Sequence, residues 1–102
     1  MPNILTNYTS ASVGTSPVTT YTVPASTTAT TVGLQLCNTT ASQIEVDVQG
    51  AGVYLLKNTP IPAGSSLSAL DGKLVFKTGE TLVVTSNTAI SVDVILSVLE
   101  QS

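Results

Sequence analysis

The chain has 102 residues, carries a formal net charge of −3 at pH 7, and contains no histidine, arginine or tryptophan. A chain of this length holds one domain. Three lysines against six carboxylates would repel a phosphate backbone, so nucleic acid is excluded as a partner. The residue types that most often transfer protons, ligate metals or bind phosphate are missing or few, and we expect no enzyme activity, no cofactor and no metal site.

The single cysteine, Cys37, cannot form an internal disulfide, and the N-terminal residues lack the basic and apolar regions of a signal peptide. No apolar run approaches the ~20 residues that cross a bilayer, so no membrane association is expected. We expect the protein to be made in the cytoplasm and to stay there. Met1 and the short length predict a free-standing protein.

Composition shifts near residue 31. Residues 1–31 hold only 5 of the 30 Leu, Ile, Val and Phe residues, so most of the core must come from later segments. We predict an extended N-terminal arm over residues 1–17, lying against another chain or against its own sheet, and a β-sandwich domain over 18–102. Ile4, Leu5 and Tyr8 are the sizeable apolar groups of this arm, and we predict that they are interface residues.

Apolar and polar residues alternate with period two from Thr19 onward, which is the pattern of half-buried strands. A short strand is predicted to end at Pro24, which cannot donate to a ladder. Two longer strands are predicted over 32–37 and 44–49, and the turn residues 38–42 between them predict a hairpin. No helical pattern occurs.

Further strands and turns follow at similar spacing. Asp71-Gly72 predicts a tight hairpin turn. The last predicted strand is the longest, with Ile90, Val92, Val94, Leu96 and Val98 along one face. It is predicted to be central, because its other face is also apolar at Ile95 and Leu99 and needs cover. Seven or eight short strands with regularly spaced turns predict an all-β, antiparallel β-sandwich or jelly roll.

The predicted core consists of the inward-facing residues of these strands: Val32, Leu34, Leu36, Ile44, Val46, Val48, Leu74, Phe76, Leu82, Val84, Val92, Val94 and Leu96.

Candidate chemical groups are sparse. Glu45 and Asp47 share one face of a predicted strand, but no Gly-bearing acidic loop accompanies them, so we expect a solvated polar face and no calcium site. Cys37 has no histidine to activate it and is expected to be structural. Asp93 is expected to face solvent or a neighbouring subunit. Only three tyrosines could stack on a sugar, which disfavours a glycosidase.

Four stretches carry a resemblance to a known family: YTVPA at 21–25, NTTAS at 38–42, PIPAGSSL at 60–67 and SVDVILSVLE at 91–100. With the sequence between them, they resemble small virion structural proteins of tailed bacteriophages, notably those of marine and cyanobacterial hosts. The resemblance covers most of the chain from Tyr21 onward. It contains no catalytic motif and implies a structural place in a virion.

Composition and resemblance together predict a capsid decoration, or cement, protein. It would bind the outside of the assembled head, contact the major capsid protein or another virion protein, and bridge capsomers as a homotrimer. One alternative is a neck, tail, baseplate or fibre protein of the same particle. A second alternative, from a different class, is a carbohydrate-binding module for host attachment.

Overall fold

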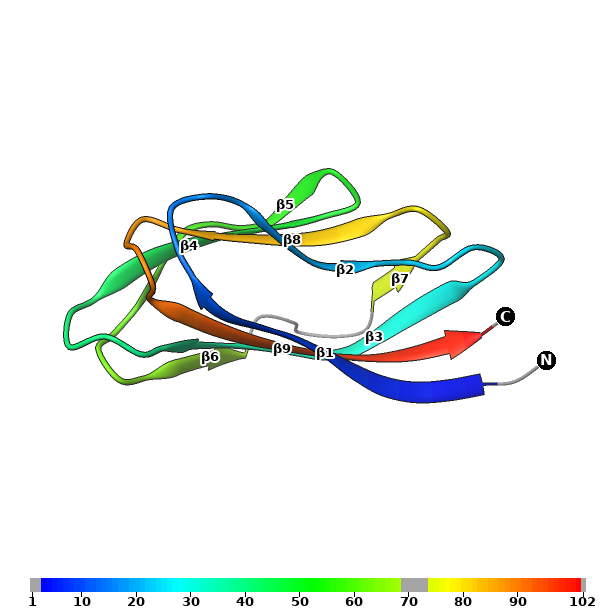
Figure 1. Ribbon diagram of the computed structural model, residues 1–102, viewed down its shortest axis with the longest axis horizontal. Coiled ribbons are helices and arrows are strands. Elements are labelled where there is room, and N and C mark those ends of the chain that lie inside the picture. Colours follow the sequence, from blue (N-terminus) through cyan, green and yellow to red (C-terminus); the bar gives the residue numbers. More distant parts are fainter. Residues whose placement is uncertain (1–2, 69–73, 102) are drawn as a thin grey trace.

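The computed structural model describes residues 3–68 and 74–101 and folds them into two antiparallel β-sheets packed face to face (Figure 1). The predicted all-β class is therefore confirmed. The strands of these described ranges are β1 (Asn3–Val13), β2 (Val18–Thr22), β3 (Thr28–Asn38), β4 (Ile44–Gly50), β5 (Val53–Ile61), β6 (Ser66–Ser68), β7 (Leu74–Phe76), β8 (Thr81–Ser86) and β9 (Val92–Gln101).

Sheet A has the strand order β1-β9-β3-β6, with β7 also paired to β3, and sheet B has the order β2-β8-β4-β5. The chain crosses between the sheets after β1, β2, β3, β5, β7 and β8. If β6 and β7 are counted as one interrupted strand, this order is an eight-stranded jelly roll, one of the two predicted architectures. The last strand, β9, lies between β1 and β3 and is therefore central, as predicted. It is not the longest strand, because it has ten residues and β1 and β3 have eleven each.

The segment predicted as an N-terminal arm forms strand β1. It pairs with β9 from Asn3 opposite Gln101 to Val13 opposite Val92, so it lies against its own sheet. The start of β1 and the end of β9 consequently lie side by side at one end of the sandwich (Figure 1).

The hairpin predicted between the strands at 32–37 and 44–49 is wrong. These strands are β3 and β4, which lie in different sheets, and residues 38–42 carry the chain from one sheet to the other. Asn38, which is fully buried at the start of this connection, stabilises it. Its side-chain amide donates hydrogen bonds to the carbonyls of Ser42, Ile61 and Pro62.

A tight hairpin does join β4 to β5. Gly50 pairs with Val53, and the two residues between them, Ala51 and Gly52, have φ angles of 53° and 84°. Positive φ at both positions is the backbone of a type I′ turn, whose twist matches that of the flanking strands.

The predicted Asp71-Gly72 turn lies outside the described residues. The strands on either side of it, β6 and β7, both run antiparallel to β3 and pair with successive parts of that strand.

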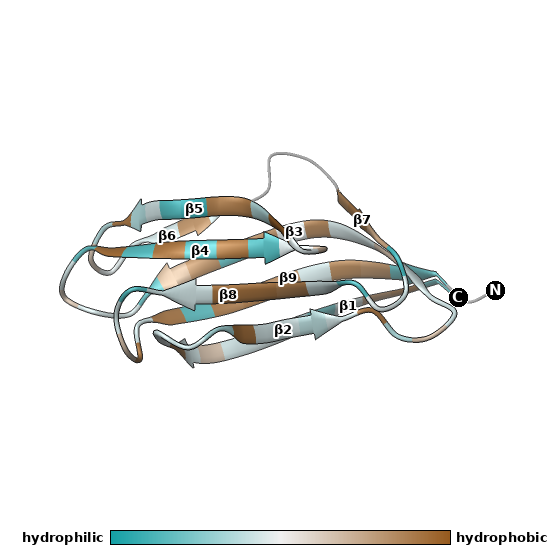
Figure 2. Ribbon diagram, turned by 90° about the horizontal axis from the view of Figure 1, so that it is seen from above, coloured by the Kyte–Doolittle hydropathy of each residue, from teal (hydrophilic) through white to brown (hydrophobic). Residues whose placement is uncertain are grey.

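The core lies between the sheets and contains most of the predicted residues. Alternation of hydrophobic and hydrophilic residues is visible along β4 (Figure 2), and its inward side chains are fully buried. Two predicted core residues differ. Val32 is 44% exposed because the β3–β9 register shifts between Thr31 and Gly33, and Leu74 is only half-buried against the core. Buried hydrophobic residues that the core prediction lacked are Val13, Tyr21, Val23, Ala29, Ile61 and Val98.

The expected start of the last strand also differs from the structure. Ile90 is 71% exposed, has a φ of 49° and precedes β9, which begins at Val92. The apolar face of the strand therefore begins two residues later than the alternation predicts.

Candidate functional site

The outward face of sheet A is the most extensive candidate surface. Strand register aligns Leu5 of β1 with Leu99 of β9, Leu99 with Thr30 of β3, and Thr30 with Val75 of β7. Leu5 is 70% and Val75 is 59% exposed, and Val32 adds a further exposed side chain beside the bulge of β3. Aliphatic and threonine side chains thus form a row across four strands, and nothing in residues 3–68 and 74–101 covers it.

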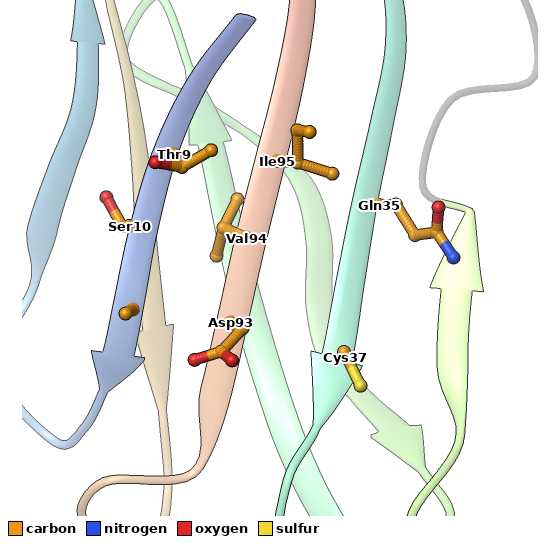
Figure 3. Close-up of a pocket in the computed structure, with 8 residues that line it drawn as sticks. Thr9, Ser10, Gln35, Cys37, Asp93, Val94 and Ile95 are labelled. Carbon is orange, nitrogen blue, oxygen red and sulfur yellow. The ribbon is translucent and has the colours of Figure 1, made fainter.

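A second row lies nearer the other end of the same face. Thr9 of β1 is opposite Ile95 of β9, which is opposite Gln35 of β3. The row borders a shallow depression of about 320 Å³ (Figure 3). The depression is lined by Thr9, Ser10, Ala11, Gln35, Cys37, Asp93, Val94 and Ile95.

Charge is scarce on this face. Asp93 is the one charged residue whose side chain the described parts of β1, β3 and β9 direct outward. Its carboxylate accepts the backbone N–H of Ser12 at 2.9 Å, and Ser12 has a φ of 58° at the register shift of β1. Asp93 is exposed, and its hydrogen bond to Ser12 stabilises the end of β1.

The three predicted interface residues occupy different environments. Leu5 is on the outward face described above. Ile4 is exposed at the end of the sandwich, opposite Glu100. Tyr8 points toward the other sheet, where its ring centroid lies 4.4 Å from that of Tyr21. The structure does not bring the three side chains together into one patch.

The hydroxyl groups of Tyr8 and Tyr21 both donate to Glu100 Oε2, at 2.8 Å and 2.6 Å. The hydrogen bond to Glu100, followed by burial, raises the pKa of Tyr8 above its ordinary value. Burial, followed by the same kind of hydrogen bond, raises the pKa of Tyr21. β1 and β9 belong to sheet A and β2 belongs to sheet B, so the hydrogen bonds of this cluster connect the two sheets.

Sheet B presents a smaller polar patch. Lys57 Nζ lies 3.4 Å from Asp47 Oδ2 and 4.6 Å from the centroid of the Tyr54 ring. Asp47 Oδ1 also accepts the backbone N–H of Asn58 at 2.7 Å. The predicted polar face around Asp47 thus contains an ion pair and one aromatic ring, beside a depression of about 220 Å³.

No group of three or more His, Cys, Asp and Glu side chains is placed to hold a metal ion within residues 3–68 and 74–101. In the same part of the chain there is no helix long and apolar enough to cross a membrane. Cys37 is free and half-buried.

The chain matches no known protein family, no curated protein and no solved structure at a significant level.

Alternation predicted part of the candidate surface. It gave Ile95 and Leu99 outward positions on a strand that needs cover on both faces, and the structure places both there. The contributions of Thr30 and Val75 depend on the pairing of β3 with β7, in which the paired residues are more than 40 positions apart along the chain. No local sequence signal reveals such a pairing.

Proposed function

We propose that this chain is a structural protein of a tailed-phage virion, and that it acts as a capsid decoration protein on the outside of the head. The supporting observation is the outward face of sheet A, which carries a row of aliphatic and threonine side chains from Leu5 to Val75. In the described parts of β1, β3 and β9, Asp93 is the one charged side chain on this face. Contiguous exposed apolar surface on a small domain marks a site of protein contact. The resemblance of the stretches at 21–25, 38–42, 60–67 and 91–100 to small virion proteins suggests the kind of particle.

Decoration suits the properties of this surface. A protein that binds an assembled head needs a preformed surface that loses little entropy on docking, and β-branched side chains on a sheet are already restricted. The major capsid protein is the proposed partner. The neck, tail, baseplate or a fibre of the same particle is the alternative location, because the same face could dock there.

Carbohydrate binding is less well supported by the three tyrosines. Tyr8 and Tyr21 stack on each other and bind Glu100. Tyr54 is 51% exposed, and Lys57 lies over its ring. Sugar platforms use open aromatic faces, and the chain offers no pair of them.

Copy number in purified particles of the source virus tests the proposal. Quantitative mass spectrometry should find hundreds of copies per particle if the protein decorates the head. A dozen or fewer copies would move it to the neck or tail. Absence from the particle would refute a virion role altogether.

A point substitution tests the docking face. Replacing Ile95 by Lys places a charge at the centre of the outward face of sheet A, and we expect at least a tenfold loss of affinity for particles that lack the protein. The control is Val53→Lys, an aliphatic position on sheet B that is 62% exposed, compared with 41% for Ile95. Circular dichroism should show both variants folded. Equal affinity of the two variants would mean that docking uses another surface.

A further inference from the structure

The two sheets end in four edges, and each edge exposes backbone N–H and C=O groups that could pair with another strand. Soluble proteins usually block such edges with proline, charge, bulges or short strands. The four edges of this sandwich differ sharply in these features.

Three edges carry blocking features. The β5 edge contains Pro60 and Lys57, and its register with β4 shifts twice. The β2 edge has only five residues and shifts register between Thr19 and Tyr21. Within the described residues, the remaining edge of sheet A is formed by β6 and β7, and the exposed Lys77 follows β7 directly.

The fourth edge, strand β1, has none of these blocking features over most of its length. It has eleven residues, Asn3–Val13, among which there is neither a proline nor a charged side chain. Its first eight residues pair with β9 without a register shift. Contacts of Tyr8 with Tyr21 and of Ser10 with Thr20 join it to sheet B through its inward side chains. These contacts leave its outer backbone edge unpaired within the described residues.

We propose that β1 pairs antiparallel with β1 of a second copy of this chain, across a two-fold axis that joins the two A sheets into one continuous sheet. The proposal does not depend on a place in a virion.

The differences between the edges indicate that the partner of β1 is the β1 strand of a second copy. A two-fold contact needs only one patch that is complementary to itself, whereas a ring of three requires β1 to meet a different edge of its neighbour. The other edges of the described residues are blocked, which argues against the trimer predicted from the sequence. β1 has no charged residue in a chain of net charge −3, so two copies of it can pair without repulsion between like charges.

The size of the contact is sufficient. An antiparallel pair forms close to one hydrogen bond per residue of each strand, so two copies of β1 can form about ten, which is the number in a typical protein interface. Leu5 and Leu99 lie beside the edge on the outward face, so the aliphatic row would continue from one subunit to the other.

Sedimentation velocity at micromolar concentrations tests the pairing. We expect the wild-type protein to be a dimer and the double variant Leu5→Lys with Thr9→Lys to be a monomer, because lysines on one copy of β1 would face those on the other. The control, Val75→Lys with Val53→Lys, adds the same charge at exposed positions away from β1 and should remain dimeric. Thermal melts establish that each variant is folded. A wild-type monomer, a trimer, or a dimeric β1 variant would overturn the proposal.

Amide hydrogen exchange locates the contact independently. Raising the protein concentration should slow exchange at least tenfold for alternate amides of residues 3–10 and leave β5 unchanged. A dimer whose concentration-dependent protection appears in β5 and not in β1 would also overturn the proposal.

Discussion

The Phe76 side chain restricts which residue can occupy position 50. The ring is 4% exposed, and a Cβ atom added to Gly50 would lie 2.9 Å from its Cζ atom and 3.1 Å from Leu55 Cδ1. Real Cβ atoms do not approach other atoms as closely as the first of these distances. The absence of a side chain at Gly50 therefore lets the Phe76 ring fill the space over the end of β4.

Replacing Phe76 by Ala should lower the free energy of unfolding by about 3 to 5 kcal/mol, because it leaves a cavity in a core of modest size. The adjacent Val75→Ala is the control: that side chain is 59% exposed, and its loss should cost within about 0.5 kcal/mol. Urea denaturation followed by circular dichroism measures both. Similar midpoints for the two variants would contradict the buried position of the ring.

The tyrosine pair makes stability depend on alkaline pH. The pKa of Tyr21 is raised in the folded state, so its contribution is complete below the ordinary value of about 10. Above pH 10 the unfolded chain loses the Tyr21 proton first, and through this one buried group the free energy of unfolding should fall by up to about 1.4 kcal/mol per pH unit. Tyr8 acts in the same direction, as does Lys57, whose pKa is raised by hydrogen bonds to Tyr54 and Asp47.

The variant Tyr21→Phe isolates one of these contributions. It should be less stable than the wild type at pH 8, because it loses a hydrogen bond to Glu100, and its stability should fall less steeply between pH 10 and 11. Urea titrations at several pH values measure the two slopes. Parallel curves for the two proteins would show that Tyr21 does not hold its proton more tightly when folded.

At the scale of elements, the connection after β3 decides between a hairpin and a crossing of the sandwich. Asn38 donates to carbonyls on both sides of this crossing and accepts the N–H and hydroxyl of Thr40 through Oδ1. Because these partners belong to the connections after β3 and after β5, one buried amide fixes two loops. This arrangement explains how the chain leaves sheet A at this point.

Asn38→Ala should therefore lower the free energy of unfolding by about 2 to 4 kcal/mol, since it leaves buried carbonyl groups without donors. Asn38→Asp should be worse, because a carboxylate would face the same carbonyls. Ser42→Ala is the control, since Ser42 contributes its backbone carbonyl and not its hydroxyl. Stability of Asn38→Ala close to that of Ser42→Ala would show that the amide is dispensable.

The elements also show what the sequence could and could not predict. Period-two alternation predicted the strand at Ile44–Gly50 and its buried face, because residues on the buried face are apolar and those between them are polar. It could not predict which strands pair, since a hairpin and a crossing need the same alternation on either side of a turn. β1 was predicted as an arm because Ser, Thr and Asn dominate it, although those residues suit an edge strand with only one covered face.

The displaced core residue has a similar explanation. Val32 continues the alternation of Leu34 and Leu36, and only the register shift against β9 turns it outward. A bulge depends on the partner strand as much as on its own sequence, so alternation in β3 alone predicts the wrong face for this residue.

At the scale of the whole molecule, the proposed contact follows the long axis. The chain measures 45 by 21 by 20 Å, and eleven residues of extended strand span roughly 36 Å. Pairing through β1 would therefore join two subunits along most of their length and give a wide, continuous outward face. A face of this kind could contact more of a particle surface than either subunit alone.

Salt distinguishes this contact from an ionic one. Screening weakens attractions between exposed charges, and β1 has no charged residue, whereas each subunit carries a net charge of −3. Raising the salt concentration from about 0.05 to about 0.5 M should therefore leave the association constant of the dimer unchanged or increase it slightly. Salt screens only the repulsion between the two negatively charged subunits. Sedimentation equilibrium at both concentrations measures this constant. If it fell tenfold at high salt, ion pairs would have to hold the subunits together. The contact would then lie on surfaces that carry the lysines and carboxylates, not along β1.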